Sequence, residues 1–311
     1  MKIAIIGAGA MGMLFGGRLS AHNDVTLVDT DENRIRAIQQ NGVCIAEPDE
    51  SEHTYTPNAA PAGTVNEPME LVMLFVKANY SAAALEGSRA LIGPNTLLLS
   101  LQNGAGHEQT LRRFAPENRV AIGVTQHNAS LCGPNRIHHG GGGQTYIGSP
   151  FEGCPGLDAV AQTFTACGFE THPQENIKAA VWEKLMMNAS SSALTGVLQA
   201  RQGLCVDSPA AKALLEKLIR EAVAVANAEG VAMDADKVLA DIVGRLEGAR
   251  QGLPSICADI RDGRKTEANT ITGAVVEAAR RNHVPAPTHE AVLLMLHALE
   301  DKRAYPQYGE I

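Results

Sequence analysis

The sequence lacks three features that would each assign it to a particular class of protein. Its six cysteines form no Cys-x-x-Cys pair and no metal-ligand spacing, so free thiols in a reducing compartment are expected. No apolar run approaches the roughly 20 residues that a membrane-spanning helix needs. Basic residues are not in excess, because 26 Lys and Arg stand against 34 Asp and Glu, a formal charge of −8. These absences predict a cytoplasmic protein with no metal site and with no nucleic-acid or membrane partner.

The chain has enough apolar residues, 45% of 311, to bury a sizeable core. In the first half, short apolar runs typical of buried strands alternate with segments typical of helices. The runs cover residues 2–6, 25–29, 71–76 and 95–101. Strands that alternate with helices indicate βαβ units and a parallel sheet. Residues 120–150 predict further short strands, with a tight glycine loop at 140–143.

After residue 178 apolar residues recur at the three- and four-residue spacing of helices. The helical segments are 178–199, 209–230, 234–250, 266–282 and 288–300. We therefore predict an α/β protein of two domains. A doubly wound parallel sheet occupies residues 1–174, and an all-helical domain occupies residues 175–311.

A glycine-rich segment follows the first strand directly and opens the first helix. Gly7 allows a tight turn, Gly9 lets the backbone approach a pyrophosphate, and Gly12 lets helix and strand pack closely. The free N–H groups of the helix N-terminus attract phosphates. This context is the one required of a Rossmann-type dinucleotide-binding fingerprint. The expected cofactor-binding residues here are Gly7, Ala8, Gly9, Ala10, Met11 and Gly12.

Asp29 ends the second strand about 20 residues further on, where a carboxylate would hold the adenosine ribose of the cofactor. A carboxylate there accepts hydrogen bonds from both ribose hydroxyls and repels a 2′-phosphate. Arg34 and Arg36 follow in the next helix, and one of them could reach back to such a phosphate. The pattern favours NAD as cofactor, with NADP as the alternative.

Further short motifs extend over nearly the whole chain. They are Val76-Lys77-Ala78, Gln102-Asn103-Gly104-Ala105-Gly106, Trp182-Glu-Lys184-Leu-Met-Met-Asn188, and Ser255 with Asp259 and Gly263-Arg-Lys-Thr-Glu267. In their order and spacing they resemble the ketopantoate reductase (2-dehydropantoate 2-reductase) family, within the 6-phosphogluconate dehydrogenase-like group. The resemblance implies an oxidoreductase of pantothenate biosynthesis, which reduces the keto group of 2-dehydropantoate to (R)-pantoate, usually with NADPH.

Lys77 and Asn103 both follow the carboxyl ends of strands, the edge at which open α/β sheets bind ligands. The resemblance implies that Lys77 contacts the cofactor. It places Asn103 near the nicotinamide ribose and the substrate. It also implies that the backbone of Ala129 meets the cofactor.

Lys184, Asn188 and Ser192 are spaced at i, i+4 and i+8, so one helix face carries all three. The helix is otherwise poor in charge, which predicts that these polar groups point into a cleft. Hydride delivery to a ketone builds negative charge on its oxygen, and a nearby ammonium can stabilise that charge and donate the proton. The resemblance gives Lys184 this general-acid role and makes Asn188 and Ser192 substrate-binding residues.

The resemblance adds Ser255 as a substrate-binding residue and Glu267 as a catalytic and cofactor-binding residue. We expect Glu267 in the first turn of a helix that begins at Thr266. There its carboxylate would orient a substrate hydroxyl and help to hold Lys184.

Three departures from the family's pattern leave alternatives open. Ser192 stands where better-studied members have a second asparagine, and Ile256 replaces a frequent methionine. Asp29 and Asp31 occupy a region where members that use NADPH often carry a basic residue. One alternative is therefore a reductase of another branched or hydroxylated 2-oxo acid. A second, less favoured, is an NAD(H)-binding sensor without turnover. A homodimer is also left open.

Overall fold

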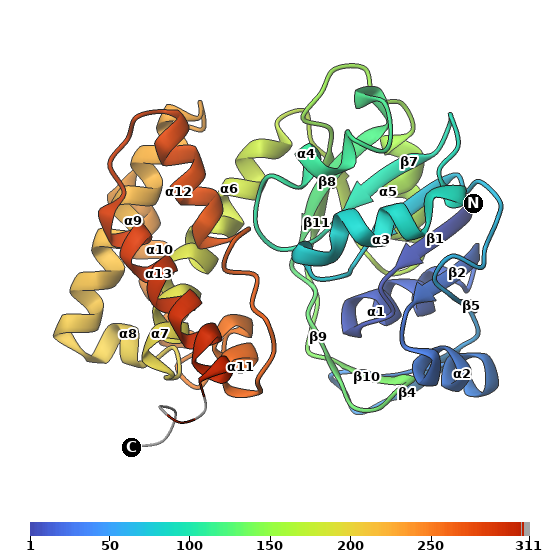
Figure 1. The fold of residues 1–311 in the computed structure, drawn as a ribbon, viewed down its shortest axis with the longest axis horizontal. Helices are drawn as coiled ribbons and strands as arrows, with labels where there is room; N and C mark the ends of the chain where they lie inside the picture. The colour runs from blue at the N-terminus through green and yellow to red at the C-terminus, as the bar shows by residue number, and fades with distance from the viewer. Residues whose placement is uncertain (306, 308–311) are drawn as a thin grey trace. The chain divides into compact units, whose positions relative to one another are not determined.

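The computed structural model describes residues 1–305 and Gln307, and it divides the chain into two compact units (Figure 1). Unit 1 comprises Met1–Gln102 and His107–Ala180, and unit 2 comprises Asn103–Gly106 and Val181–Ile311. These ranges differ from the predicted ones in two places. Residues 175–180 belong to unit 1, and the short Asn103–Gly106 segment belongs to unit 2. The last few residues of the predicted 175–311 range lie outside the described part of the chain.

An eight-stranded sheet forms the centre of unit 1, in the order β12-β11-β8-β7-β6-β1-β2-β5. The strands are β1 (Lys2–Ile6), β2 (Asp24–Asp29), β5 (Asn58–Pro61), β6 (Leu71–Leu74), β7 (Leu97–Ser100), β8 (Val120–Thr125), β11 (Thr145–Gly148) and β12 (Thr171–Pro173). All neighbouring pairs are parallel except β8 and β11. The predicted doubly wound, mostly parallel sheet is confirmed.

The sheet reverses its winding at β1, which pairs with β2 on one side and with β6 on the other. The segments that leave β1 and β6 therefore diverge at the carboxyl edge of the sheet. Such a switch point is where open α/β sheets bind ligands. The glycine-rich turn follows β1, and Lys77 follows β6.

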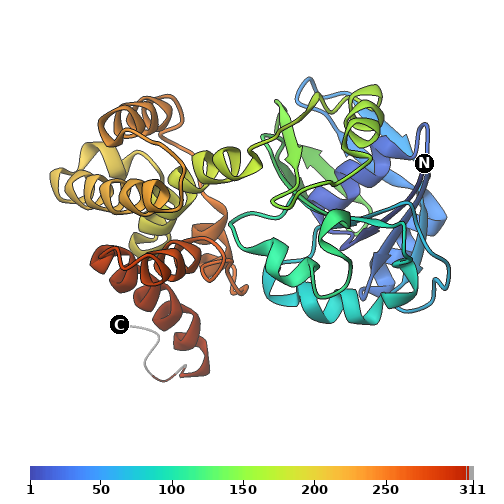
Figure 2. The same ribbon diagram turned by 90° about the horizontal axis from the view of Figure 1, so that it is seen from above.

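Helices cover both faces of this sheet (Figure 2). They are α1 (Ala10–Leu19), α2 (Glu32–Asn41), α3 (Ser81–Gly87), α4 (His107–Leu111) and α5 (Leu157–Ala166). Alternate strand residues such as Ile3, Ile5 and Met73 join one buried cluster with α1 and α5. Residues with the opposite parity, such as Val72, are equally buried and face the other side, because successive side chains of a strand point to opposite faces.

A second, four-stranded sheet was not predicted, although two of its strands lie within residues 120–150, where short strands were expected. Its order is β4-β3-β10-β9, with β3 (Val43–Ala46), β4 (Glu52–Tyr55), β9 (Ala129–Leu131) and β10 (Arg136–His139). These strands are only three or four residues long, and β4 has hardly any buried residue, so they carry little apolar signal. The sheet packs against α1, which thus lies between two sheets.

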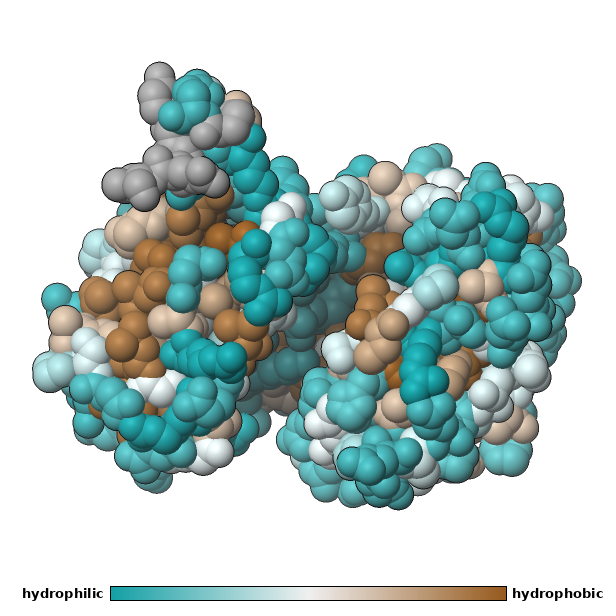
Figure 3. All heavy atoms as spheres, turned by 90° about the horizontal axis from the view of Figure 1, so that it is seen from below, coloured by the Kyte–Doolittle hydropathy of each residue, from teal (hydrophilic) through white to brown (hydrophobic). Residues whose placement is uncertain are grey.

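Unit 2 is helical. Its elements are α6 (Ile177–Met187, which begins in unit 1), η4 (Asn188–Ser192), α7 (Ala193–Leu198), α8 (Leu204–Asp207), α9 (Pro209–Ala228), α10 (Ala235–Gly248), α11 (Ser255–Arg261), α12 (Thr272–Arg281), α13 (Pro287–Asp301) and η5 (Lys302–Ala304). The long helix α9 contacts α8, α10, α12, α13 and η4. Apolar side chains also gather on the face of this unit that Figure 3 shows.

Two predicted helices of unit 2 differ from the structure. The segment 178–199 is interrupted by a π-helical turn at η4, where the hydroxyls of Ser190 and Ser191 donate hydrogen bonds to backbone carbonyls one turn back. The prediction that a helix begins at Thr266 is wrong, because α12 begins only at Thr272. The N–H and hydroxyl of Thr266 both donate to Glu300, which holds this segment as a turn.

Within the described residues, no helix combines the length and the apolar character that crossing a bilayer requires. Nor do three or more His, Cys, Asp or Glu side chains gather there as potential metal ligands.

Candidate active site

The glycine-rich turn after β1 has the shape that a pyrophosphate needs. Gly7 has a φ of 102°, and a Cβ there would lie 2.6 Å from the backbone nitrogen of Val76. A Cβ on Gly12 would lie 1.9 Å from the carbonyl oxygen of Gly7, so both positions exclude a side chain. Gly9 differs, since a Cβ on it would meet no heavy atom within 4 Å.

Gly9 is also the N-cap of α1, and no side chain caps the N–H groups there. Open space and uncapped N–H donors at a helix N-terminus together fit an anionic phosphate group. The residues of this turn therefore fit the dinucleotide that the sequence predicts.

Asp29 lies at the end of β2, directly beside this turn. Its Oδ2 accepts a hydrogen bond from the Ala8 N–H at 2.7 Å, and its Oδ1 accepts one from the Asp31 N–H at 2.9 Å. The carboxylate thus fixes the glycine-rich turn as well as the start of the next loop. Acceptor positions remain for a ribose hydroxyl, since two carboxylate oxygens offer about four lone-pair sites.

Arg34 occupies a position that the sequence alone left open. From the first turn of α2 its guanidinium reaches back to Asp29 Oδ2 at 3.6 Å and to Asp31 Oδ2 at 3.5 Å. Its side chain is 20% exposed, and its Nε is buried without a hydrogen-bond partner in the described structure. Arg36, by contrast, pairs with Glu32 on an exposed face.

Lys77 follows β6 and precedes the short helix η1 (Ala78–Tyr80). The backbone next to it is held by Gln102, whose Nε2 donates to the Val76 carbonyl at 2.5 Å and to the Ser81 hydroxyl at 2.8 Å. Gln102 is buried, and sequence reasoning assigned it no role. Its position directly before Asn103, at the end of a strand, is the only signal that could have singled it out.

The Asn103–Gly106 segment packs tightly against the turn that carries Glu267. The Ala105 N–H donates to the Thr270 carbonyl at 2.9 Å. Gly104 has a φ of 100°, and a Cβ there would lie 2.1 Å from the same carbonyl oxygen. Asn103 Nδ2 lies 3.5 Å from Glu267 Oε2. Two predicted site residues, 164 positions apart in the chain, therefore lie side by side in unit 2.

Lys184 lies in the last turn of α6 and joins this group electrostatically. Burial lowers the pKa of its ammonium to about 8, and the negative charge of Glu267 opposes that shift. An ammonium that titrates near neutral pH can donate a proton readily. Asn103, Lys184 and Glu267 are thus brought together within one unit.

The remaining predicted residues lie on other elements of the two units. Asn188 and Ser192 begin and end the π-helical turn η4, and π-helical turns are frequent at functional sites. Ser192 is buried, whereas Asn188 is partly exposed. Ser255 is the exposed first residue of α11, which packs against η4 and α7. In unit 1, Ala129 begins β9 and pairs with His139 of β10.

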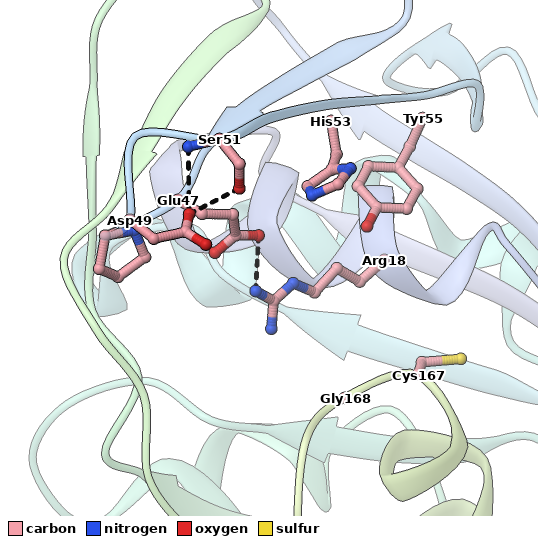
Figure 4. Close-up of a pocket in the computed structure, with 9 residues that line it drawn as sticks. Arg18, Glu47, Asp49, Ser51, His53, Tyr55, Cys167 and Gly168 are labelled. Carbon is pink, nitrogen blue, oxygen red and sulfur yellow. Dashed lines mark hydrogen bonds and ion pairs between the residues drawn. The ribbon is translucent and has the colours of Figure 1, made fainter.

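A hollow on the surface of unit 1, drawn in Figure 4, contains none of the predicted site residues. Its volume is about 580 Å³, and it lies beside the small sheet, with Arg18, Glu47, His53 and Tyr55 in its wall. Arg18 Nη2 pairs with Glu47 Oε1 at 2.6 Å, as the dashed line in Figure 4 shows. The hollow is wide open to solvent.

Comparisons with known proteins agree with this arrangement. Residues 3–151 match the family model Ketopantoate reductase PanE/ApbA, and residues 176–300 match its C-terminal counterpart. The 2-dehydropantoate 2-reductase of Halobacterium salinarum is 30% identical over 297 residues, which cover 92% of this chain and 95% of the relative. That of Pyrococcus abyssi is 30% identical over 310 residues, 98% of each protein.

Solved structures of similar proteins share this fold over nearly the whole chain. The ternary structure of D-mandelate dehydrogenase with NADH and anilino(oxo)acetate has a TM-score of 0.90 at 27% identity and covers 97% of this chain and 99% of that one. A PanE/ApbA family ketopantoate reductase from Ralstonia eutropha has a TM-score of 0.89 at 27% identity, with 98% and 100% covered.

The doubly wound sheet and its glycine-rich turn form a dinucleotide-binding fold, and the family matches define the protein as an oxidoreductase that depends on a nicotinamide dinucleotide. Within that class, the chain belongs to the ketopantoate reductase family.

Proposed function

We propose that the protein reduces the keto group of 2-dehydropantoate to the hydroxyl of (R)-pantoate, and that Lys184 donates the proton. In this reaction C2 of the substrate gains a hydride, the ketone oxygen gains a proton, and the cofactor is oxidised. The observation that carries the proposal is the grouping of Lys184, Glu267 and Asn103, with the pKa of Lys184 lowered to about 8.

Each residue has a role that follows from its chemistry. The Lys184 ammonium stabilises negative charge on the ketone oxygen and then transfers its proton. The Glu267 carboxylate favours the charged form of Lys184 and can accept a hydrogen bond from a substrate hydroxyl. The Asn103 amide can donate to the substrate or to the nicotinamide ribose. Asn188, Ser192 and Ser255 would complete the substrate contacts.

The nicotinamide cofactor supplies the hydride when it is bound. Gly7, Ala8, Gly9, Ala10, Met11 and Gly12 would hold its pyrophosphate, with Asp29 on the ribose and with Lys77 and Ala129 as further contacts. We propose NADH as the preferred form, because the Asp29 carboxylate disfavours a 2′-phosphate. The ion pair between Arg34 and Asp29 weakens that repulsion, so we expect the preference to be moderate.

A 2-oxo acid with a bulkier side chain is a second candidate substrate. Ser192 is shorter than the asparagine of better-studied family members, and Ala189 and Ala193 beside it are also small. The likeness to D-mandelate dehydrogenase, whose ternary structure contains an aromatic oxo acid, supports this alternative.

A turnover assay distinguishes these functions. Purified protein is mixed with NADH or NADPH and with 2-dehydropantoate, benzoylformate or pyruvate, and cofactor absorbance is followed. The proposal predicts the highest kcat/KM for 2-dehydropantoate. A higher kcat/KM for benzoylformate would support the second candidate. Cofactor binding without turnover of any 2-oxo acid would instead support the sensor.

A further inference from the structure

Glu267 lies on a connection that has no helix or strand of its own. The connection comprises residues 262–271, between the end of α11 at Arg261 and the start of α12 at Thr272. Where the backbone of such a connection is buried, its polar groups need partners elsewhere in the protein. The position of the Glu267 carboxylate therefore depends on the contacts that other elements make with this connection.

Glu300, near the C-terminus of α13, accepts both polar hydrogens of Thr266, the residue directly before Glu267. The Thr266 N–H donates to Glu300 Oε1 at 2.7 Å, and the Thr266 hydroxyl donates to the same oxygen at 2.5 Å. Thr266 is only 1% exposed, so little water can reach these donors. The hydroxyl also accepts a hydrogen bond from the Ala268 N–H at 3.1 Å. Thr266 thus links Glu300 to the backbone on both sides of Glu267.

A second side chain of α13 meets the same connection further along. His297 Nε2 lies 2.8 Å from Asn269 Oδ1. His297 and Glu300 are spaced at i and i+3, so they share one side of the helix. The Glu267 carbonyl in turn accepts a hydrogen bond from the Thr270 N–H at 3.1 Å. The turn around Glu267 is therefore fixed from α13 at two points.

We propose that Glu300 is a positioning residue of the active site: it accepts the two hydrogen bonds of Thr266 and so holds the Glu267 carboxylate in place beside Lys184. The inference rests on the proposed roles of Lys184 and Glu267, and it extends the site to α13, on which no site residue was expected. Both donors on Thr266 are uncharged. What Glu300 contributes is therefore an acceptor oxygen rather than a negative charge.

Loss of this acceptor leaves two buried donors of Thr266 without their partner. An unsatisfied buried donor is costly, so the turn rearranges until the N–H and the hydroxyl find other acceptors, and Glu267 moves with it. The charge of Glu267 opposes the lowering of the Lys184 pKa by burial, so its withdrawal takes that pKa further below about 8. Less Lys184 is then protonated near neutral pH, and reduction becomes slower.

The pH profile of reduction tests this role. In Glu300→Ala, the pH above which kcat falls should move toward acid by about one unit, the effect of removing one nearby opposite charge. Glu300→Gln keeps an acceptor oxygen and should retain the profile of the parent. Thr266→Val, which replaces only the hydroxyl by a methyl group, should shift the profile in the same direction as Glu300→Ala.

The matched control is Asp301→Ala, which removes the exposed acid next to Glu300 on α13 and should leave the profile unchanged. Circular dichroism checks that each variant is folded. A folded Glu300→Ala variant with the profile of the parent would overturn the proposal. So would a Glu300→Gln variant that behaves like Glu300→Ala, because the charge of Glu300 would then be what matters. If Glu300→Ala does not fold, Thr266→Val decides, and an unshifted profile in that variant overturns the proposal.

A titration of Lys184 separates this inference from the proposed reaction. In protein with ¹³C-labelled lysine, the Lys184 signal is identified by its absence in Lys184→Arg, and its pKa is followed by NMR without turnover. The pKa should be lower in Glu300→Ala than in the parent and unchanged in Glu300→Gln. In a Glu267→Gln background, Glu300→Ala should add no further shift, because two residues that act through one contact are not additive.

The two failures are then distinguishable. A parent protein that reduces no 2-oxo acid, but in which Lys184 responds to Glu300→Ala as described, would disprove the proposed reaction and support the positioning role. An equal Lys184 pKa in the parent and in Glu300→Ala would overturn the positioning role, whatever the turnover.

Discussion

Lys184, to which we assign the proton transfer, shows how its surroundings change the acidity of a side chain. An exposed lysine keeps its proton far above neutral pH, whereas burial near Glu267 brings the pKa of Lys184 to about 8. The residue type and its spacing from Asn188 were visible in the sequence. Its burial and its nearness to Glu267 were not, because Glu267 lies 83 positions further along the chain.

Removing the Lys184 ammonium should reduce turnover while leaving the cofactor bound. We expect Lys184→Ala to lower kcat on the true substrate by about 10²–10⁴-fold, the usual contribution of a positioned acid. Its Kd for NADH, measured by fluorescence, should change little, since the expected cofactor residues Gly7, Gly9, Gly12 and Asp29 belong to unit 1. Lys217→Ala, an exposed lysine on α9, is the control. Near-normal turnover in Lys184→Ala would exclude the general-acid role.

The pKa of Lys184 also predicts a pH profile. Reduction requires the protonated ammonium, so kcat should be constant below pH 8 and fall about tenfold per pH unit above it. Oxidation of the hydroxy acid requires neutral lysine and should rise through the same range. Reduction that is independent of pH from 7 to 10 would contradict this assignment.

Asp29 and Arg34 should together set the choice of cofactor. Asp29→Asn removes the negative charge beside the ribose and frees Arg34 for a 2′-phosphate, so kcat/KM for NADPH relative to NADH should rise about tenfold. In Asp29→Asn/Arg34→Gln this gain should be lost. Arg36→Gln, which changes an exposed arginine of the same helix, is the control. If the ratio for Asp29→Asn equals that of the parent, Asp29 does not discriminate between the cofactors.

At the level of elements, a network of polar side chains connects the small sheet to α1. His127 Nδ1 lies 3.1 Å from His139 Nε2, and His139 Nδ1 lies 2.7 Å from Glu47 Oε2, which in turn pairs through Oε1 with Arg18. Burial, followed by the positive charges of His139 and Arg18, lowers the pKa of His127 to about 4. Because these residues lie on α1, on β10 and directly after β3, their protonation state affects how these elements are held together.

The lowered pKa of His127 in this network predicts that the protein loses stability in mild acid. The unfolded chain takes up the His127 proton near pH 6.5, whereas the folded protein resists it down to about pH 4. The contribution of neutral His127 to the free energy of unfolding is therefore fully present above pH 6.5. It falls as the pH drops, by about 2 kcal/mol at pH 5.

Urea unfolding at pH 7.5 and pH 5 measures this loss. His127→Phe, which keeps an aromatic ring next to Phe15 and Phe169, should lose less stability over the same interval. An equal loss in the parent and the variant would show that His127 is not the group that titrates.

The elements that sequence reasoning found were those with a strong local signal. The buried strands β1 and β6 are continuous apolar runs, and β2 is apolar at Val25, Leu27 and Val28. The small sheet was missed because its three- and four-residue strands draw their burial from α1 rather than from an apolar run of their own. The start of α12 was misplaced because Thr266 bonds to Glu300, a contact 34 residues distant.

On the scale of the whole molecule, the proposed reaction draws on residues from distant parts of the chain. The sequence could identify the dinucleotide fingerprint, because its residues are contiguous. It could not show that Asn103 belongs with the helical unit, since this depends on the approach of Gly104 to Thr270. The central claim is that these parts serve a hydride transfer to a 2-oxo acid.

Deuterium transfer tests that claim most directly. The protein is incubated with nicotinamide cofactor that carries deuterium on the reactive face of C4, together with 2-dehydropantoate, and the product is examined by mass spectrometry and NMR. We predict pantoate with one deuterium at C2 and an equal amount of oxidised cofactor. Cofactor that stays reduced in the presence of 2-dehydropantoate and every other 2-oxo acid, or product without deuterium at C2, would contradict the account.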